Sequence, residues 1–187
     1  YQAKTGLVDG SKKEDEVFKL ELLMKQAHIT PQDRTVVSAA LNRAEQTGAP
    51  AAAMELPDGK IITGKTSDLL GSSAALLLNA LIELAGISHE THILSPAAIE
   101  PIQILKTSYL GSRNPRLHTD EILIALSSST ALNPAAQKAL EQIPNLKGCQ
   151  VHTSVMLSQV DIQTFKRLGI QLTCEPIYEH KSILHNA

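Results

Sequence analysis

Residues 51–67, AAAMELPDGKIITGKTS, decide the fold of this chain. Two short apolar runs, 51–56 and 60–63, flank Pro57-Asp58-Gly59, and this combination predicts two strands joined by a tight turn. The following stretch, Leu69 to Ala85, is apolar on almost every side at helical spacing, which predicts a helix covered by other elements. A strand pair that leads into a buried helix indicates an α/β protein.

Further elements are predicted on the carboxyl side of this unit. A short strand is expected at 92–94, and helices are expected at 97–110, 119–130 and 134–143. Residues 148–157 alternate in polarity like a strand, and a helix at 161–168 and a last strand at 170–175 follow. This order predicts a mixed sheet with helices on both faces, a three-layer α-β-α domain that spans residues 49–187.

The amino-terminal residues, 1–48, predict two helices. Ser11 and Glu14 have the spacing of a capping box, and Pro31 stands where the second helix is expected to begin. Gly48 is expected to end that helix. We expect the two helices to pair as an αα-hairpin at the end of a preceding helical subdomain.

The composition favours a cytoplasmic globular domain. Hydrophobic residues make up 43% and charged residues 19% of the chain, and the net charge of -2 gives no basic surface for nucleic acid. The longest apolar stretch is too short for a membrane span. Cys149 and Cys174 are expected to be buried free thiols. We therefore expect neither nucleic acid nor a membrane as a partner, and no cofactor or metal in this chain.

Residues 59–66, GKIITGKT, fit the letters of a phosphate-binding loop. We expect a different structure, because Gly59 belongs to the predicted turn and the next residues belong to a strand. A simpler anion site remains possible at Lys65, Thr66 and Ser67, where the strand gives way to the helix and free N–H groups attract anions. The alternative is a helix cap beside a solvated lysine.

A second candidate site is the loop before the helix at 119–130. Arg113, Asn114, Arg116 and His118 lie in this loop, and arginine side chains suit phosphate or carboxylate ligands. Thr119 is expected to cap the helix. The alternative is an exposed loop whose arginines pair with nearby acids.

The third candidate is the pair His152 and Ser154, which share one face of the strand at 148–157. Residues two apart on a strand point in parallel, so they seldom meet as a base and a nucleophile. A polar pair that faces a pocket or an interface is therefore expected, and not a hydrolase centre.

Several motifs, in this order, resemble one bacterial family. They are ELPDGKIITGKTSDLL at 55–70, LSP at 94–96, EPIQ at 100–103, GSRNPRLH at 111–118, GCQVHTS at 148–154 and LTCEP at 172–176. The chain is similar to the C-terminal part of the domain-of-unknown-function 1846 family (uncharacterised protein family 0371). This resemblance implies a three-layer domain with a topology like that of cytidine deaminases. Because the zinc-binding signature is missing, it implies the fold and not deamination.

We therefore predict the C-terminal lobe of a larger cytoplasmic bacterial protein, whose partner is the remainder of the full-length chain. The lobe is expected to contribute contacts in a homo-oligomer and one wall of a site for a small phosphate- or carboxylate-bearing ligand. Two alternatives stay open, a substrate-binding or catalytic domain of a nucleotide-dependent enzyme and a pure dimerisation module. The candidate residues are Lys65, Thr66, Ser67, Arg113, Asn114, Arg116, His118, His152 and Ser154.

Overall fold

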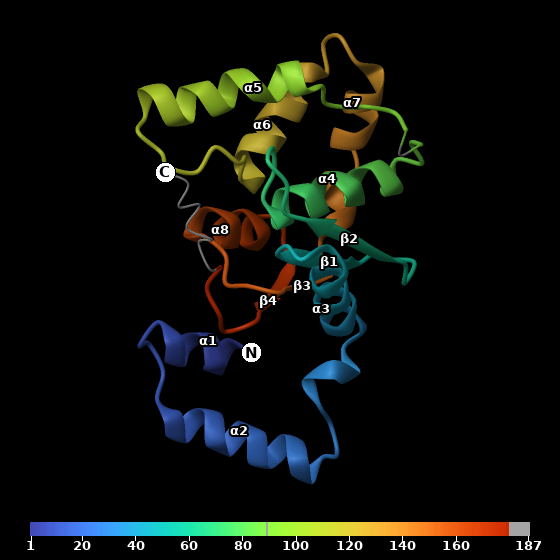
Figure 1. Ribbon diagram of the computed structural model, residues 1–187. Coiled ribbons are helices and arrows are strands. Elements are labelled where there is room, and N and C mark those ends of the chain that lie inside the picture. Colours follow the sequence, from blue (N-terminus) through green and yellow to red (C-terminus); the bar gives the residue numbers. More distant parts are fainter. Residues whose placement is uncertain (89, 180–187) are drawn as a thin grey trace.

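A four-stranded sheet lies at the centre of the computed structural model, which describes residues 1–88 and 90–179 (Figure 1). The strands are β1 (Ala51–Glu55), β2 (Ile61–Lys65), β3 (Gln150–Thr153) and β4 (Gln171–Cys174), in the order β2-β1-β3-β4. Strand β1 runs antiparallel to β2 and β3, whereas β3 and β4 are parallel. The predicted α/β class with a mixed sheet is confirmed.

Helices cover both faces of this sheet. The α-helices are α1 (Gln2–Val8), α2 (Glu14–Gln26), α3 (Thr35–Thr47), α4 (Ser72–Leu84), α5 (Pro96–Ile104), α6 (Thr119–Ser129), α7 (Pro134–Leu140) and α8 (Gln159–Arg167). Short 3-10 helices span Pro31–Asp33 and Ile143–Leu146, and a π-helical segment, Leu105–Tyr109, continues α5. Within the described residues, no helix is long and apolar enough to cross a membrane.

Alternate residues of β1 belong to different cores, because successive side chains on a strand point to opposite faces. Ala53 packs with Val36 and Ala40 of α3 on one face. Ala52 and Met54 belong to the larger core on the other face, which α4, α6, α7 and α8 share. The alanines of this central strand leave room for helices to approach from both sides.

Gly64 lets α4 lie directly against β2. An ideal Cβ at Gly64 would lie 2.2 Å from the backbone nitrogen of Leu76, so no side chain fits there. Gly59 has a different role, since its φ of +83° closes the turn between β1 and β2 and its Cβ would meet open space. The run GKIITGKT therefore consists of a turn and a strand, as the hairpin prediction required, and forms no phosphate-binding loop.

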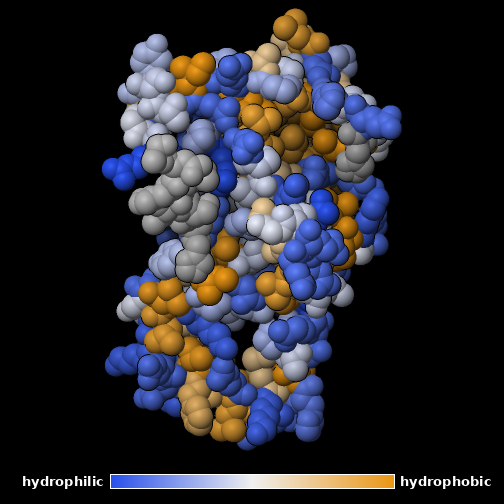
Figure 2. All heavy atoms as spheres, in the orientation of Figure 1, coloured by the Kyte–Doolittle hydropathy of each residue, from blue (hydrophilic) through white to orange (hydrophobic). Residues whose placement is uncertain are grey.

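The predicted αα-hairpin of α2 and α3 is not observed. Helix α2 packs beside α1, where Lys4 Nζ and Glu21 Oε1 are 2.7 Å apart, whereas α3 packs on the sheet (Figure 1). The apolar face of α3 is buried against β1, which removes the surface that a hairpin would have used. Figure 2 shows apolar side chains exposed at the lower end of the molecule, over α1 and α2. The boundary between residues 48 and 49 stays a prediction.

Two of the strands differ from their predicted extents. Residues 92–94 form no strand, because Ile93 and Leu94 bury their side chains in the core without a ladder partner. The carbonyl of Ile93 instead accepts a hydrogen bond of 3.2 Å from Asn133 Nδ2. Strand β3 ends at Thr153, well before the predicted end at residue 157.

Substitution of the two glycines by alanine should have unequal effects. Gly64→Ala should lower the free energy of unfolding by about 3 kcal/mol, because its Cβ overlaps the backbone of α4. Gly59→Ala is the matched control and should cost only about 1 kcal/mol, because it strains the backbone alone. Urea unfolding measures both values, and an equal loss in the two variants would show that the contact between α4 and β2 does not restrict residue 64.

Candidate functional site

Three helix starts gather at one edge of the sheet. Strands β2, β3 and β4 run in the same direction, so their carboxyl ends share this edge, and α4 and α8 follow β2 and β3 there. The loop before α6 joins them, because Leu117 N donates to Leu69 O at 2.9 Å and Gly71 N donates to Leu117 O at 3.2 Å. Ligands of α/β proteins commonly bind at such an edge.

The carboxylate of Asp161 ties the start of α6 to the start of α8. Its Oδ1 accepts hydrogen bonds of 2.9 Å from both the backbone nitrogen and the hydroxyl of Thr119. Its Oδ2 accepts a hydrogen bond of 2.7 Å from Ser158 Oγ. Burial would raise the pKa of Asp161, but the hydrogen bonds from His118, Thr119 and Ser158 together lower it below its ordinary value. A charged carboxylate is therefore stable at the positive ends of two helices.

His118 is held by this carboxylate through one ring nitrogen. Nδ1 lies 3.0 Å from Asp161 Oδ2 and 3.3 Å from Ser158 Oγ. Across residues 1–88 and 90–179, Nε2 has no hydrogen-bond partner, and it is not among the fully buried polar atoms, so it meets solvent. The hydrogen bond to Asp161 raises the pKa of His118, against the opposing effect of burial.

A buried lysine, Lys106, also holds the corner of the domain where α6 and α8 begin. Lys106 Nζ, in the π-helical segment, donates to Glu121 Oε2 at 2.7 Å and to the carbonyl of Arg116 at 2.6 Å. Glu121 Oε2 also accepts a hydrogen bond of 2.7 Å from the backbone nitrogen of His118. Lys106 and Glu121 therefore fix the backbone on both sides of Leu117, just where His118 leaves the loop. His118, and not Thr119, is the N-cap residue of α6.

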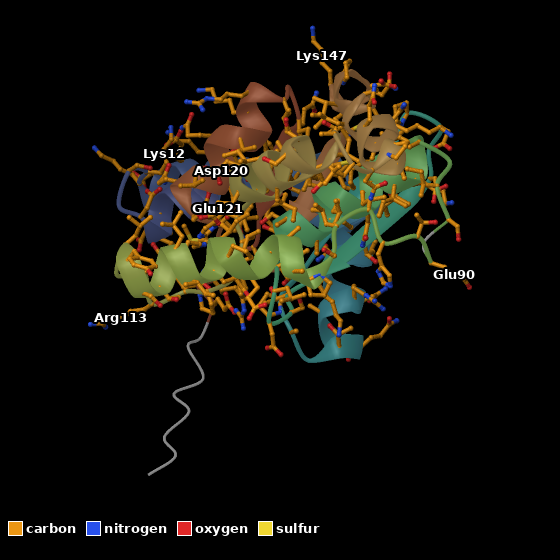
Figure 3. All side chains as sticks on the ribbon, turned by 90° about the horizontal axis from the view of Figure 1, so that it is seen from above. Lys12, Glu90, Arg113, Asp120, Glu121 and Lys147 are labelled. Atoms are coloured by element: carbon orange, nitrogen blue, oxygen red, sulfur yellow. The ribbon has the colours of Figure 1, made fainter. Side chains whose placement is uncertain are left out.

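The arginine loop divides into an anchored part and a free part. Arg116 pairs with Glu179, with an N–O distance of 2.9 Å, and its backbone nitrogen donates to Asn114 Oδ1 at 3.2 Å. Ser112 Oγ accepts a hydrogen bond of 3.2 Å from the backbone nitrogen of Asn114. Arg113 is exposed, and Figure 3 shows its side chain pointing outward from the body of the domain. The loop is thus folded by its own polar groups and presents Arg113 to solvent.

Lys65, Thr66 and Ser67 do not form the start of α4. The N-cap residue of α4 is Gly71, and Ser67 Oγ accepts hydrogen bonds from the backbone of Leu69 and Leu70 in a turn before the helix. Thr66 is buried, and its backbone nitrogen donates to Pro50 O. Because Gly64 faces α4, the neighbouring Lys65 leaves the sheet on the face that α3 covers. The predicted cap at Thr66 or Ser67 is wrong, because a turn at residues 67–70 precedes the N-cap residue, Gly71.

His152 lies in a separate polar cluster on the α3 face of the sheet. It is fully buried, with Nδ1 at 2.9 Å from Thr173 Oγ1 and Nε2 at 3.2 Å from Glu175 Oε1. Arg34 donates to the same Thr173 oxygen at 2.7 Å, and the ring of Tyr1 lies 4.5 Å from the imidazole ring. Burial lowers the pKa of His152. Both of its ring nitrogens are occupied, so the structure uses this histidine in packing.

Ser154 extends the ladder between β1 and β3. Its Oγ accepts a hydrogen bond of 2.9 Å from Ala51 N, and its backbone nitrogen donates to Ala51 O. The structure brings His118 and the arginine loop together at the edge of the sheet, and it places His152 and Ser154 outside that group.

A groove of about 1100 Å³ begins at this corner and crosses the open side of β4 toward α1. Ser158, which bonds to Asp161, lies at one end, and Arg34 lines the part beside α1. Met156, Leu157 and Tyr178 also line the groove and supply apolar surface. In the described part of the chain, no three His, Cys, Asp or Glu side chains lie close enough together to bind a metal ion.

Asp161, Lys106 and Glu121 were not predicted as site residues from the sequence. Ser158 and Asp161 have the spacing of a capping box, and Ser158 is indeed the N-cap of α8, so a signal for this helix start was present. That signal predicts only a local cap. The contact of Asp161 with His118 crosses 43 residues of sequence, which no local pattern encodes.

These features define a mixed α/β domain with a histidine–aspartate pair at the carboxyl edge of its sheet. The sequence matches the family described as "Domain of unknown function DUF1846, C-terminal" over residues 32–184, and the chain belongs to this family. The predicted resemblance is confirmed.

Two curated relatives illustrate the match. A UPF0371 protein of Corynebacterium efficiens is 56% identical over 165 residues, which cover 88% of this chain and 33% of that protein. A UPF0371 protein of Streptococcus uberis is 47% identical over 170 residues, which cover 91% of this chain and 34% of that protein. The chain spans about a third of the length of these relatives and is therefore one part of a larger bacterial protein.

Asp161→Asn should lower the pKa of His118, because the hydrogen bond to Asp161 is the main cause of its elevation. A proton NMR titration of the His118 ring resonances measures the shift. Glu121→Gln is the comparison variant, since Glu121 bonds only to the backbone nitrogen of His118 and acts on the imidazole ring through its charge, and it should lower the pKa less. An equal shift in both variants would mean that Asp161 has no special role in holding the imidazole.

The His118–Asp161 pair should stabilise the fold only between two pH limits. Asp161 sets the lower limit, and His118 sets the upper limit. The contribution of Asp161 to the free energy of unfolding is fully present above its unfolded pKa of 3.8. It is lost as the pH falls through the lower pKa of the folded state. The contribution of His118 is complete below its unfolded pKa of 6.5 and is lost as the pH rises through its higher folded value.

A double-mutant cycle of Asp161→Asn and His118→Gln should therefore give a coupling of about 1–2 kcal/mol at about pH 5.5 and a smaller one at about pH 9. Urea unfolding of the four proteins at both pH values measures this coupling. A coupling that does not change with pH would contradict the assigned charge states.

Proposed function

We propose that this chain is the C-terminal lobe of a larger cytoplasmic protein and forms one wall of a site for a small anionic ligand. The observation that carries the proposal is the His118–Asp161 pair. Asp161 fixes one ring nitrogen and leaves Nε2 facing solvent, in a loop that also contains Arg113 and Arg116. A protonated imidazole and arginine side chains are suitable donors to phosphate or carboxylate oxygens.

The electrostatics of the corner support an anion over a cation. The negative charge of Asp161 is balanced by four hydrogen bonds, including the one to His118, and that of Glu121 is balanced by Lys106. Arg113 makes no ion pair with any residue in 1–88 or 90–179. Arg113 is therefore a positive group that stays available to a ligand.

A catalytic role is the second candidate function, and it would make the full-length protein a nucleotide-dependent enzyme. A histidine whose Nδ1 donates to a buried carboxylate presents a basic Nε2, which is the arrangement that general acid–base catalysis requires. His118→Gln in the intact protein separates the two candidates. Loss of turnover with unchanged ligand binding favours catalysis, whereas loss of binding favours recognition.

We also propose that the sheet is the core of a fold like that of the cytidine deaminases, and that the lobe contributes contacts in a homo-oligomer. The order β2-β1-β3-β4, with β2 antiparallel to β1 and a helix between β3 and the parallel β4, supports the first proposal. Exposed apolar residues such as Ile104 of α5 and Ile124 of α6 support the second. A pure dimerisation module remains the outcome if no anion binds.

Calorimetric titration of the intact protein with inorganic phosphate, sugar phosphates and small carboxylates tests the ligand site. His118→Gln and Arg113→Ala should each weaken binding by about 10-fold, which corresponds to about 1.4 kcal/mol. Binding should also weaken as the pH rises through the pKa of His118.

Lys147→Ala is the matched control, because it also removes one exposed positive charge, and Figure 3 shows Lys147 at the end of the domain opposite Arg113. It should leave the affinity unchanged. Equal losses in Arg113→Ala and Lys147→Ala would reduce the effect to overall charge, and no binding of any anion would refute the site.

A further inference from the structure

Helix α2 is apolar on more than one side, and yet none of its residues is buried. Phe18 is 68% exposed, Leu22 is 47% exposed and Leu23 is 59% exposed. An isolated helix of this length is only marginally stable in water, and helices in proteins obtain most of their stability from a packed apolar face. The exposed face of α2 therefore lacks the packing that usually stabilises such a helix.

The apolar residues of α2 form two stripes. Val17, Leu20 and Met24 follow the spacing of one helical face, and Val17 and Met24 are half-buried beside α1. Phe18 and Leu22 follow the spacing of a second face and are both exposed. Lys19 on one side and Glu21 with Lys25 on the other separate the two stripes. A helix with two apolar stripes is suited to packing between two layers of structure.

The extent of the family match indicates what covers the second stripe. The match to the C-terminal domain begins at residue 32, so α1 and α2 lie outside it. The relatives are about three times as long as this chain, and most of their length belongs to a region other than this domain. Helix α2 also lies apart from the sheet and its covering helices, at the lower end of the molecule (Figures 1 and 2).

We propose that the stripe of α2 formed by Phe18 and Leu22 is the surface on which the remaining region of the same polypeptide docks. Helices α1 and α2 then form an arm that joins the α/β domain to the remaining region of the polypeptide. Helix α1 contacts β4 of the domain, and it also contacts α2. Lys4 and Glu21 hold the arm together through their ion pair. The inference rests on the chain being part of a larger protein and is independent of the ligand site at His118.

Site-specific cross-linking in the intact protein tests the docking surface. Benzoylphenylalanine at position 18 is photoactivated in an equal mixture of unlabelled and nitrogen-15-labelled protein, and the cross-linked peptides are identified by mass spectrometry. We expect peptides that join α2 to the region outside this chain, always with one isotope in both halves. Peptides of mixed isotope would show a second copy on this surface and would overturn the inference, and so would the absence of cross-links to that region.

Leu132 provides the matched control, because it is 94% exposed in the turn between α6 and α7. Benzoylphenylalanine at this position should give no such peptides. In thermal unfolding of the intact protein, Phe18→Asp should lower the midpoint by about 3 °C or more, whereas Leu132→Asp should leave it unchanged. Equal midpoints in the two variants would overturn the inference. Neither experiment depends on a bound anion, so a failed ligand titration and a failed cross-link are distinguishable.

Discussion

A buried negative charge must be matched by hydrogen bonds, and the carboxylate of Asp161 imposes this constraint on the corner where α6 and α8 begin. Four donors meet it, and they come from three segments, the loop before α6, the first residue of α6 and the cap of α8. Loss of any segment would leave a buried charge uncompensated, which is among the most costly defects in a protein interior. The orientation of His118 follows from this requirement.

The same corner shows how a stable interior can present a reactive surface. Asp161 and Lys106 are both buried, and each is paired with a partner that lies closer to solvent, His118 and Glu121. The two pairs are linked through the backbone of His118, whose nitrogen donates to Glu121. Within this network His118 reaches solvent with an unused ring nitrogen. Residues that position one another in this way allow a ligand to be bound without rearrangement.

His152 shows why a polar residue on a strand is weak evidence for a site. Its ring is as well hydrogen-bonded as that of His118, but both of its nitrogens have partners within the protein. The difference lies in the surroundings, because α1 and Arg34 close over the α3 face of the sheet, whereas the loop before α6 opens toward solvent. Burial leaves His152 with a lowered pKa, and the hydrogen bond to Asp161 leaves His118 with a raised one.

Local patterns determined the class of this protein. The turn at Pro57-Asp58-Gly59, the alternation in β3 and the apolar run of α4 each depend on residues close in sequence. The turn lies where it was predicted, and β3 and α4 lie within their predicted ranges, although both are shorter. The arginine loop and His118 could also be selected from the sequence, because loop-forming residues surround them. Tertiary structure alone decided that α3 joins the sheet, that α2 stands apart, and that Asp161 holds His118. These outcomes depend on contacts between buried surfaces and charges that lie far apart in the sequence. Local sequence patterns do not predict such contacts.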